Sequence, residues 1–429
     1  MKIDRDKETD KMSDPERLLA KKAEPTGSRE RIASLDFIRG LAVMGILAAN
    51  IVIFGDLRAS YLWPAASLSD EGAPADWMWL AQLVLIDGKM RGLFALLFGA
   101  GLVLFQDRAD AHTDSTTRQF RRLAILLVFG LMHYFLLWEG DILVLYAVCG
   151  GLALLGVGME ARGLLMVGTL IYLLGLAFTA EAFLPAHLAV DFGMASPEMR
   201  EAYEAGLNRL LDHQLVHAGL IGGDSYGGFV SHHVSEHWAQ PFEGLIYTMP
   251  EAIGLMLIGI GLYRADIFRG EVSRRIRGVA LAGIGIGSGI TWAAGLYGLS
   301  TGPSYYGGAF VYLVLTPVPK LGVIVGLVVL LAHYTPRSEG WLGDRIKAAG
   351  RAAFSNYIGT SLLMIFVFHG WGLGLFGKLS RPELYLVMLG AWIVMLLWSK
   401  PWLERYRYGP LEWLWRCLTY GKLFAMRRN

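Results

Sequence analysis

Long apolar runs recur along most of the chain, and many of them reach the roughly 18 residues that a helix needs to cross a bilayer. Composition agrees with this pattern, since 54% of the 429 residues are hydrophobic and only 18% are charged. In lipid, each backbone polar group must be satisfied within its own segment or by a neighbour, which restricts such a chain to bundled helices. We therefore predict an all-α polytopic membrane protein rather than two or three soluble domains.

The apolar runs predict about ten transmembrane helices in one bundle, with both termini in the cytoplasm. Lys and Arg cluster before the first span, after the last, and in the loops that follow the second, sixth and eighth spans. Only Lys378 and Arg381, in a short outer loop, run against this bias. Cytoplasmic loops carry the excess of Lys and Arg, which gives the N-in, C-in orientation. The predicted spans are 35–54, 77–106, 121–138, 142–159, 163–184, 242–263, 276–298, 307–333, 352–376 and 383–403.

These spans divide the chain into five parts. Residues 1–34 hold nine Lys or Arg and no aromatic residue, which is typical of a disordered cytoplasmic tail. Residues 35–184 and 242–403 are each predicted to contribute five spans. They flank an extracytoplasmic loop at 185–241. The last part, 404–429, is basic and aromatic, as expected of a segment at the cytoplasmic membrane interface.

The outer loop is rich in acids and holds six of the ten histidines. Apolar residues at helical spacing predict an amphipathic helix over 197–220 that lies on the outer surface or caps a cavity. His213 and His217 lie one turn apart on it, so a zinc site is geometrically conceivable. Such pairs are common on solvated helices and no cysteine assists, so we expect no metal. The other histidines considered for that site are His232, His233 and His237.

An apolar hairpin at 121–146 carries ionisable residues where lipid ordinarily excludes them. Its first arm is apolar except for His133 and Tyr134, and it turns at Glu139-Gly140-Asp141. Two spans joined by so short a turn lie side by side, so Asp141 lies close to the end that holds His133. We predict that His133 is a general base or a nucleophile oriented by Asp141, in a hydrated crevice open to the outside. The alternative is a structural hydrogen bond across the bundle.

The second span contains three charged residues near the bilayer centre, Asp87, Lys89 and Arg91. Each costs about 2.5–3.5 kcal/mol at that depth, so the three face a wet cavity or one another. Gly88 and Gly92 predict a break in the helix there. The net positive charge favours an anionic ligand, and the alternative is a sealed pair between Asp87 and one of the cations.

Further polar residues form two predicted clusters, one at each membrane surface. In the first span, Asp36, Arg39 and Asn50 fall on one stripe, and an intrahelical Asp36–Arg39 pair is the structural alternative. The predicted cytoplasmic cluster consists of Asp36, Arg39, Arg351, Ser355 and Asn356, and the outer cluster of Asn50, His133, Glu139, Asp141 and His369.

Several stretches resemble the bacterial YeiB-type membrane proteins, whose C-terminal half is catalogued as domain of unknown function 418. The resemblance spans nearly the whole chain in the same order and implies a multi-pass protein of the bacterial inner membrane. The matching stretches are RIASLDFIRGLAVMGILAANI at 31–51, GKMRGLFALLFGAG at 88–101, RRLAILLVFGLMHYFLLWEGDILVLYA at 121–147, GRAAFSNY at 350–357 and RYGPLEWLWRCLTYGK at 407–422.

The opening L-D-x-x-R-G-x-A also resembles the first helix of the transmembrane acyltransferase superfamily, which includes the lysosomal heparan glucosaminide acetyltransferase and bacterial sugar O-acetyltransferases. This resemblance implies transfer of an acyl group from cytoplasmic acyl-CoA to an acceptor on the far side, using a histidine. In the O-acetyltransferases a histidine occupies the spacing at which Asn50 stands here. His133 is then the candidate that replaces it.

We therefore predict an integral membrane acyltransferase that uses acyl-CoA as donor and an extracytoplasmic hydroxyl or amine as acceptor. The donor phosphates are expected near Arg39 and Arg351, and its pantetheine near Lys89 and Arg91. Asn50 is expected to donate to the oxyanion. The remaining substrate-binding candidates are Asp36, Glu139, Ser355, Asn356 and His369.

Two other functions stay open on sequence grounds. One is a transporter or flippase for a small anionic or lipid-linked substrate, since members of the YeiB group have been described as candidate transporters. The other is a membrane scaffold whose outer loop binds a partner. Membrane lipid is an expected partner and nucleic acid is not, and homo-oligomers stay open.

Overall fold

The computed structural model describes residues 33–69, 72–109, 115–302, 304–335 and 338–428, and its regular elements are helices. The predicted tail, 1–34, lies outside these residues except for its last two, which begin α2. The helices are α2 (Ala33–Gly55), α3 (Gly72–Leu85), α4 (Lys89–Ala109), α5 (Ser115–Leu136), α6 (Leu143–Ala153), α7 (Ala161–Asp191), α8 (Pro197–Gly222), α9 (Tyr226–Glu236), α10 (Gln240–Glu243), α11 (Leu245–Arg264), α12 (Arg274–Ser300), α13 (Tyr305–Phe310), α14 (Pro317–Tyr334), α15 (Trp341–Arg351), α16 (Ala353–Phe368), α17 (Arg381–Arg405) and α18 (Pro410–Tyr420).

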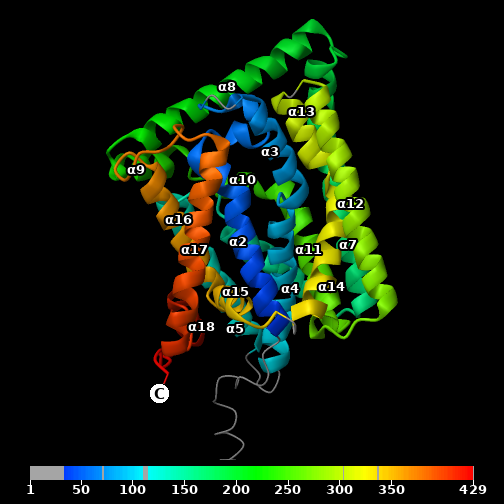
Figure 1. The fold of residues 1–429 in the computed structure, drawn as a ribbon, viewed down its shortest axis with the longest axis vertical. Coiled ribbons are helices and arrows are strands. Elements are labelled where there is room, and N and C mark those ends of the chain that lie inside the picture. Colours follow the sequence, from blue (N-terminus) through cyan, green and yellow to red (C-terminus); the bar gives the residue numbers. More distant parts are fainter. Residues whose placement is uncertain (1–32, 70–71, 110–114, 303, 336–337, 429) are drawn as a thin grey trace, which may run out of the picture.

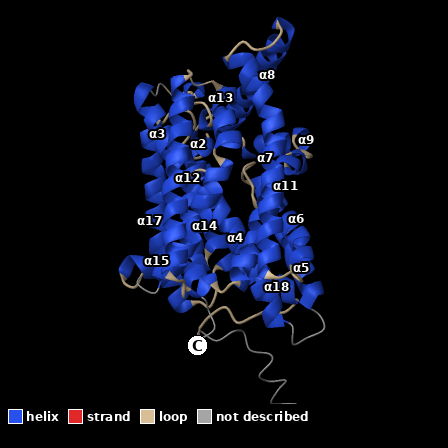
Figure 2. Cartoon of the chain, turned by 90° about the vertical axis from the view of Figure 1, so that its right-hand side faces the viewer, coloured by secondary structure: helices blue, strands red, loops and turns tan. Residues whose placement is uncertain are grey.

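Eight helical segments of the described chain are long and apolar enough to cross a membrane. The bent pair of α15 and α16 would supply a ninth, and the apolar stretch Leu143–Gly156 is shorter. Figures 1 and 2 show these segments bundled side by side, with loops gathered at the two ends. The chain is therefore an all-α polytopic membrane protein, as predicted. The count of ten spans and the N-in, C-in orientation stay predictions.

Several predicted spans are broken or shifted by backbone chemistry. The predicted break in the second span is present, because α3 ends at Leu85, α4 begins at Lys89, and Gly88 between them has a φ of 69° that side-chain-bearing residues rarely adopt. The predicted span 307–333 is divided into α13, a π-helical turn at Val311–Leu315, and α14, which starts at a proline.

Two further boundaries differ from prediction. The predicted span 352–376 ends early, since α16 stops at Phe368, and α15 meets α16 at 89°. In the other direction, α7 runs to Asp191, beyond the predicted end at 184.

Helix α2 runs through the middle of one half of the bundle and packs against α4, α14, α15, α16 and α17 (Figure 1). Its crossing with α15 is close because both helices have glycine at the contact. A Cβ at Gly40 would collide with the backbone oxygen of Ile346, and one at Gly350 with that of Asp36. Small residues that let helix backbones approach are a general means of packing in membranes.

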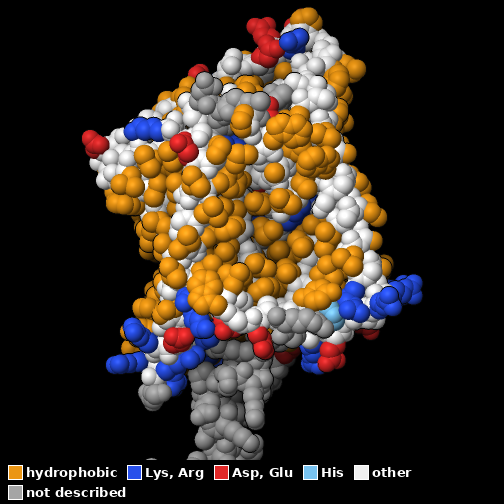
Figure 3. Space-filling model, in the orientation of Figure 1, with side chains coloured by type: hydrophobic (Ala, Val, Ile, Leu, Met, Phe, Trp, Pro, Cys, Tyr) orange, Lys and Arg blue, Asp and Glu red, His pale blue; other side chains and the backbone are white. Residues whose placement is uncertain are grey.

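The two ends of the bundle differ in chemistry. Helix α8 lies across one end with α9 beside it, and we call this the histidine end (Figure 1). The predicted amphipathic helix 197–220 is this α8, which begins after Ser196, whose side chain accepts a hydrogen bond from Met199 N. The opposite end, formed by α15 and α18, is the basic end, where Lys and Arg gather below a largely hydrophobic face (Figure 3).

The α2–α15 crossing makes Gly350 a sensitive position. We expect Gly350→Ala to lower the free energy of unfolding by about 1–3 kcal/mol, the usual cost of overpacking, because the new methyl group meets backbone rather than a movable side chain. The measurement is reversible unfolding in detergent micelles. The matched control is Gly359→Ala in α16, where nothing lies within 4 Å of the added Cβ. Equal stability of the two variants would contradict the close crossing.

Candidate functional site

His133 is the centre of a hydrogen-bonded chain of three side chains. Its Nδ1 lies 2.9 Å from Asp141 Oδ1, and its Nε2 lies 2.9 Å from Ser361 Oγ on α16. An ionised carboxylate only accepts, so Nδ1 donates to Asp141, and Nε2 of the neutral ring accepts from the Ser361 hydroxyl. We call these three residues the buried triad.

The turn between α5 and α6 positions the triad. His133 lies in the last turn of α5, and Asp141 stands just before α6, where its Oδ2 accepts from Val144 N at 2.7 Å. Gly130 permits this arrangement, because a Cβ there would collide with the Val144 backbone. Both carboxylate oxygens of Asp141 are therefore engaged, which fixes its orientation toward His133.

The predicted pairing of His133 with Asp141 is present, but the predicted crevice open to the outside is wrong. The side chains of the pair are 0% and 1% exposed, and Ser361 is 1% exposed. The ring of Tyr357 covers the imidazole at a centroid distance of 5.0 Å, and Trp138 lies edge-on to it at 6.4 Å. These rings cover the triad. Both nitrogen atoms of the imidazole have hydrogen-bond partners within the protein, so no water is needed to satisfy them.

A cavity of about 180 Å³ lies between the triad and the basic end, and we call it the basic cavity. It is lined by Arg39 from α2, Arg122 from α5 and Arg351 from α15. The close α2–α15 crossing brings Arg39 and Arg351 around this one space. The other walls include Phe94, Phe98, Ile142, Tyr146, Tyr357, Glu412 and Trp415.

Arg122 is held in the basic cavity by aromatic faces. Its guanidinium carbon lies 4.7 Å from the centroid of Trp415 and 5.2 Å from that of Phe105. Its Nη1 is buried and has no hydrogen-bond partner among the described residues. Aromatic rings stabilise the charge without using its N–H groups, which leaves a donor available for an anion.

Glu412 of α18 caps the start of α16 beside the same cavity. Its carboxylate accepts from Phe354 N at 2.7 Å, from Ser355 N at 3.1 Å and from Ser355 Oγ at 2.5 Å. Helix starts leave N–H groups unsatisfied, and a carboxylate there is favourable. The prediction that Ser355 binds substrate is therefore corrected, since its hydroxyl joins α16 to α18 and it does not line the cavity.

Asn356 also has a structural position instead of the predicted substrate-binding one. Its Nδ2 donates to Ala349 O at 3.0 Å and to Ser399 Oγ at 3.1 Å. Its Oδ1 accepts from Trp398 Nε1 at 2.8 Å. The residue is 2% exposed and joins α15, α16 and α17 at the sharp bend.

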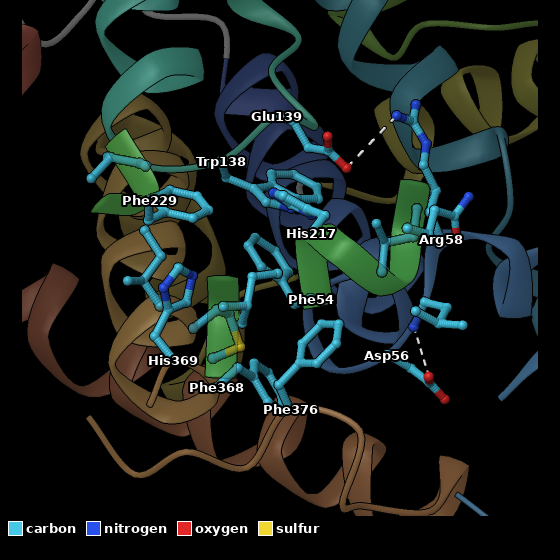
Figure 4. A pocket seen from close by; sticks show the side chains of 17 residues that line it. Phe54, Asp56, Arg58, Trp138, Glu139, His217, Phe229, Phe368, His369 and Phe376 are labelled. Carbon is cyan, nitrogen blue, oxygen red and sulfur yellow. Dashed lines mark hydrogen bonds and ion pairs between the residues drawn. The ribbon is translucent and has the colours of Figure 1, made fainter. Parts of the chain in front are cut away.

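A second, smaller cavity of about 40 Å³ lies on the histidine-end side of the triad, and we call it the histidine cavity. Figure 4 shows Trp138, Glu139 and His217 among the side chains that line it. Glu139 forms an ion pair with Arg58 at 3.8 Å. His369, buried after α16, lines the same cavity.

Two ionisable groups of the histidine cavity, Glu139 and His369, have shifted pKa values. Burial alone would raise the pKa of Glu139, but Arg58 and the neighbouring histidines bring it below its usual value. Burial lowers the pKa of His369 to about 4. The predicted outer cluster is therefore divided, with Glu139 and His369 at this cavity and His133 and Asp141 sealed beneath it.

Lys89 and Arg91 line neither cavity, so the predicted pantetheine path past them is corrected. Arg91 pairs with Glu251 of α11 at 2.7 Å, and Lys320 lies 3.5 Å from the same carboxylate. Lys89 donates to Leu83 O at 2.7 Å. Asp87 accepts from Gln82 Nε2 at 2.9 Å, so the charge of Arg91 is paired with Glu251, whereas Lys89 and Asp87 are hydrogen-bonded to uncharged groups.

The remaining predicted residues lie apart from the triad. Asn50 is half-buried on α2 and lines neither cavity, so the structure does not bring it to His133 as an oxyanion donor. Asp36 forms the predicted intrahelical pair with Arg39 at 3.4 Å.

Sequence reasoning missed three residues that the structure brings to the site. Ser361 lies in an apolar span beside another hydroxyl residue, Thr360, and is 228 residues from His133, so nothing in its local sequence marks it. Arg122 lies at the start of the predicted span 121–138, where a basic residue is expected at the cytoplasmic boundary and signals no binding site. Glu412 is an acid within a basic and aromatic segment, and that contrast was the one available signal.

Comparison with known proteins gives consistent relatives. Residues 262–422 match the family described as protein of unknown function (DUF418). The chain is 30% identical to the uncharacterized protein YxaH of Bacillus subtilis over 92% of this chain and 96% of the relative. It is also 30% identical to the uncharacterized protein YeiB of Escherichia coli, over 91% and 96% of the two chains. An uncharacterized 39.9 kDa protein of Bacillus acidopullulyticus is 25% identical over 94% and 98%. No solved structure matches the chain.

The structural position of Asn356 leads to a stability prediction. We expect Asn356→Ala to lower the free energy of unfolding, because Trp398 Nε1 would lose its hydrogen-bond acceptor. A polar group left without its partner in this way costs about 1–3 kcal/mol. Thermal melting in detergent measures this. Thr360→Ala on the same helix is the control, because its hydroxyl bonds only to carbonyls of its own helix. Melting of both variants at the wild-type temperature would show that the bend does not depend on Asn356.

Proposed function

The chain belongs to the YeiB-type family of bacterial membrane proteins, and on that premise and its own geometry we propose that it is an acyltransferase of the bacterial inner membrane. It would carry an acyl group from acyl-CoA at the basic end to a hydroxyl or amine acceptor at the histidine end. The excess of Lys and Arg at the basic end supports a cytoplasmic location for that end.

The observation that carries this proposal is the buried triad between two cavities. A serine hydroxyl hydrogen-bonded to an imidazole, which a carboxylate orients in turn, is the arrangement that activates serine for acyl transfer. Tyr357 and Ile142, on one side of the triad, line the basic cavity. Trp138 and Ile365, on the other side, line the histidine cavity.

The chemistry follows in two balanced steps. Ser361 Oγ attacks the thioester carbonyl carbon, His133 Nε2 takes the hydroxyl proton, and the departing CoA thiolate takes that proton from His133. The acceptor oxygen or nitrogen then attacks the Ser361 ester, and its proton passes through His133 to Ser361 Oγ. A covalent carrier suits this geometry because the two cavities are separate. His133, with both ring nitrogens engaged, acts as the base in this scheme rather than as the acylated residue.

The basic cavity supports recognition of the donor. Arginine guanidinium groups bind phosphate through parallel N–H bonds, and coenzyme A carries several phosphates. The volume of about 180 Å³ is smaller than the roughly 300–1,000 Å³ that encloses a whole drug-sized ligand. The cavity would therefore hold only part of the donor, and the rest would lie at the basic end.

Acyl passage requires the sealing side chains to move. Tyr357 separates the basic cavity from the imidazole, and Trp138, stacked on Phe54 at 3.9 Å between ring centroids, separates the histidine cavity from it. Side-chain movement within a rigid bundle is enough for a short acyl group.

Transport of a small anion is the second candidate, and one observation favours it. The described interior holds three cations, Lys89, Arg91 and Lys320, near two carboxylates, Asp87 and Glu251. Arg91 and Glu251 retain 33% and 23% side-chain exposure despite their depth. Ionisable groups at such depth mark substrate or ion pathways in transporters.

Incubation of purified protein with radiolabelled acetyl-CoA tests the catalytic proposal. We expect label on Ser361 and release of CoA, both abolished in Ser361→Ala and His133→Ala, and a loss of about 10⁴ in rate for Asp141→Asn, as for other oriented serine–histidine pairs. Thr360→Ala, one position away on the same helix, should retain activity. Substrate flux into liposomes without CoA turnover would instead favour transport.

The donor site has its own test. We expect Arg122→Ala to weaken CoA binding about 10- to 100-fold, since a hydrogen bond to a charged group contributes about 1.5–3 kcal/mol. Calorimetric titration of CoA into the purified protein measures the change. The exposed neighbour Arg121 provides the control, because it does not line the basic cavity. An equal loss in Arg121→Ala would show that CoA is attracted by general surface charge and not by this cavity.

A further inference from the structure

A separate cluster of metal-binding side chains lies at the histidine end. Glu139 comes from the turn between α5 and α6, His217 from α8 and His233 from α9. One ligand atom from each lies within 4.8 Å of the other two. The α5–α6 turn and two consecutive helices much later in the chain therefore direct carboxylate oxygen and imidazole nitrogen to a common point.

The two histidines have ring nitrogen atoms that no other residue with a described position satisfies. His233 is 0% exposed, and neither of its ring nitrogens has a hydrogen-bond partner among the described residues. The Nε2 of His217 is buried and is likewise without such a partner. Buried polar atoms are paired in nearly all native structures, and an unpaired one is destabilising. A ligand common to both rings removes that penalty.

The neighbouring contacts are aromatic and leave these nitrogens available. The rings of His217 and His233 lie 5.2 Å apart between centroids, and Phe229 packs on His233 at 4.7 Å. Glu139 is also paired with Arg58, but that side chain is 60% exposed and can turn to solvent. The carboxylate is therefore available to a more strongly bound cation.

We propose that Glu139, His217 and His233 bind a divalent transition metal ion of the zinc class. Two imidazoles and one carboxylate are a ligand set that zinc uses in sites with three protein ligands, and the same set suits iron(II). Such sites keep at least one coordination position for water or substrate. Because Glu139 and His217 also line the histidine cavity, a small molecule in that cavity reaches the ion (Figure 4).

The metal would also tie α8 and α9 to the α5–α6 turn, just beyond Asp141. This inference does not depend on acyl transfer and holds equally for a transporter. It departs from the sequence-based expectation of no metal, which considered only histidine spacing within the loop. Of the histidines considered there, His213, His232 and His237 lie outside the three-residue cluster.

Metal binding to the tag-free, full-length protein in detergent is the test. After stripping with chelator, Co²⁺ is added and the visible absorption is followed, with Zn²⁺ then added to displace it. We expect one Co²⁺ per chain and a thermal stability that rises with either ion. In His217→Ala and His233→Ala the affinity should fall by more than about 100-fold, beyond the effect of losing an outer-shell partner. His213→Ala, one turn earlier on α8, should bind as the wild type does.

Other outcomes decide against the site. Absence of Co²⁺ and Zn²⁺ binding by the folded wild type would overturn it, as would unchanged affinity in His217→Ala and His233→Ala. If the histidine variants do not fold, Glu139→Gln replaces them, because it keeps the size of a partly exposed side chain. Unchanged Co²⁺ affinity in that folded variant overturns the proposal, and a fall supports it. Elemental analysis of the protein as isolated is a further measurement. Stoichiometric zinc or iron supports the proposed site, and stoichiometric magnesium or calcium contradicts it.

Discussion

A histidine buried inside a lipid-embedded bundle is costly unless its ring nitrogens are satisfied, and His133 meets this requirement with Asp141 on one side and Ser361 on the other. The constraint determines how the helices meet. The hydrogen bond to Asp141 holds α5 and α6 together as a hairpin. The hydrogen bond to Ser361 holds α16, which comes much later in the sequence, against that hairpin. The same requirement explains why Arg91 meets Glu251 and why the polar atoms of Asn356 are used at the α15–α16 bend.

This pairing also separates the two ends of the molecule. The arginine-lined basic cavity lies on one side of the triad, and the histidine cavity lies on the other. A continuous pore would let ions through, whereas the proposed Ser361 carrier would pass a small group without opening the protein to both sides. Polar atoms without a partner in the described part of the chain occur next to these cavities, on Arg122 at one end and on His217 and His233 at the other. Their position supports ligand binding, because unpaired polar atoms are costly unless something else satisfies them.

Each kind of site therefore has a recognisable physical signature. Polar side chains that serve packing have their partners within the bundle, as Ser355 and Asn356 do. Groups offered to a ligand keep donors or lone pairs unused beside a cavity. Polar residues at similar depth in the membrane therefore have different roles. The difference depends on whether the protein supplies a hydrogen-bond partner, which depth alone does not show.

The amino-acid pattern was sufficient for features whose parts lie within a few helical turns of each other. It gave the lipid-embedded helices, the break at Gly88, the helix of 197–220, and the pairing of His133 with Asp141, because local periodicity and a short turn control all four. It could not give Ser361 as the third member of the triad, or the meeting of Arg122 with Arg39 and Arg351, or Glu139 beside His233. Those contacts join segments far apart in the sequence, Ser361 lying 228 residues from His133, and they depend on which helix faces turn toward each other. Which helix faces meet depends on the packing of the whole bundle. Close crossings such as that of Gly40 against α15 determine which side chains line the same cavity.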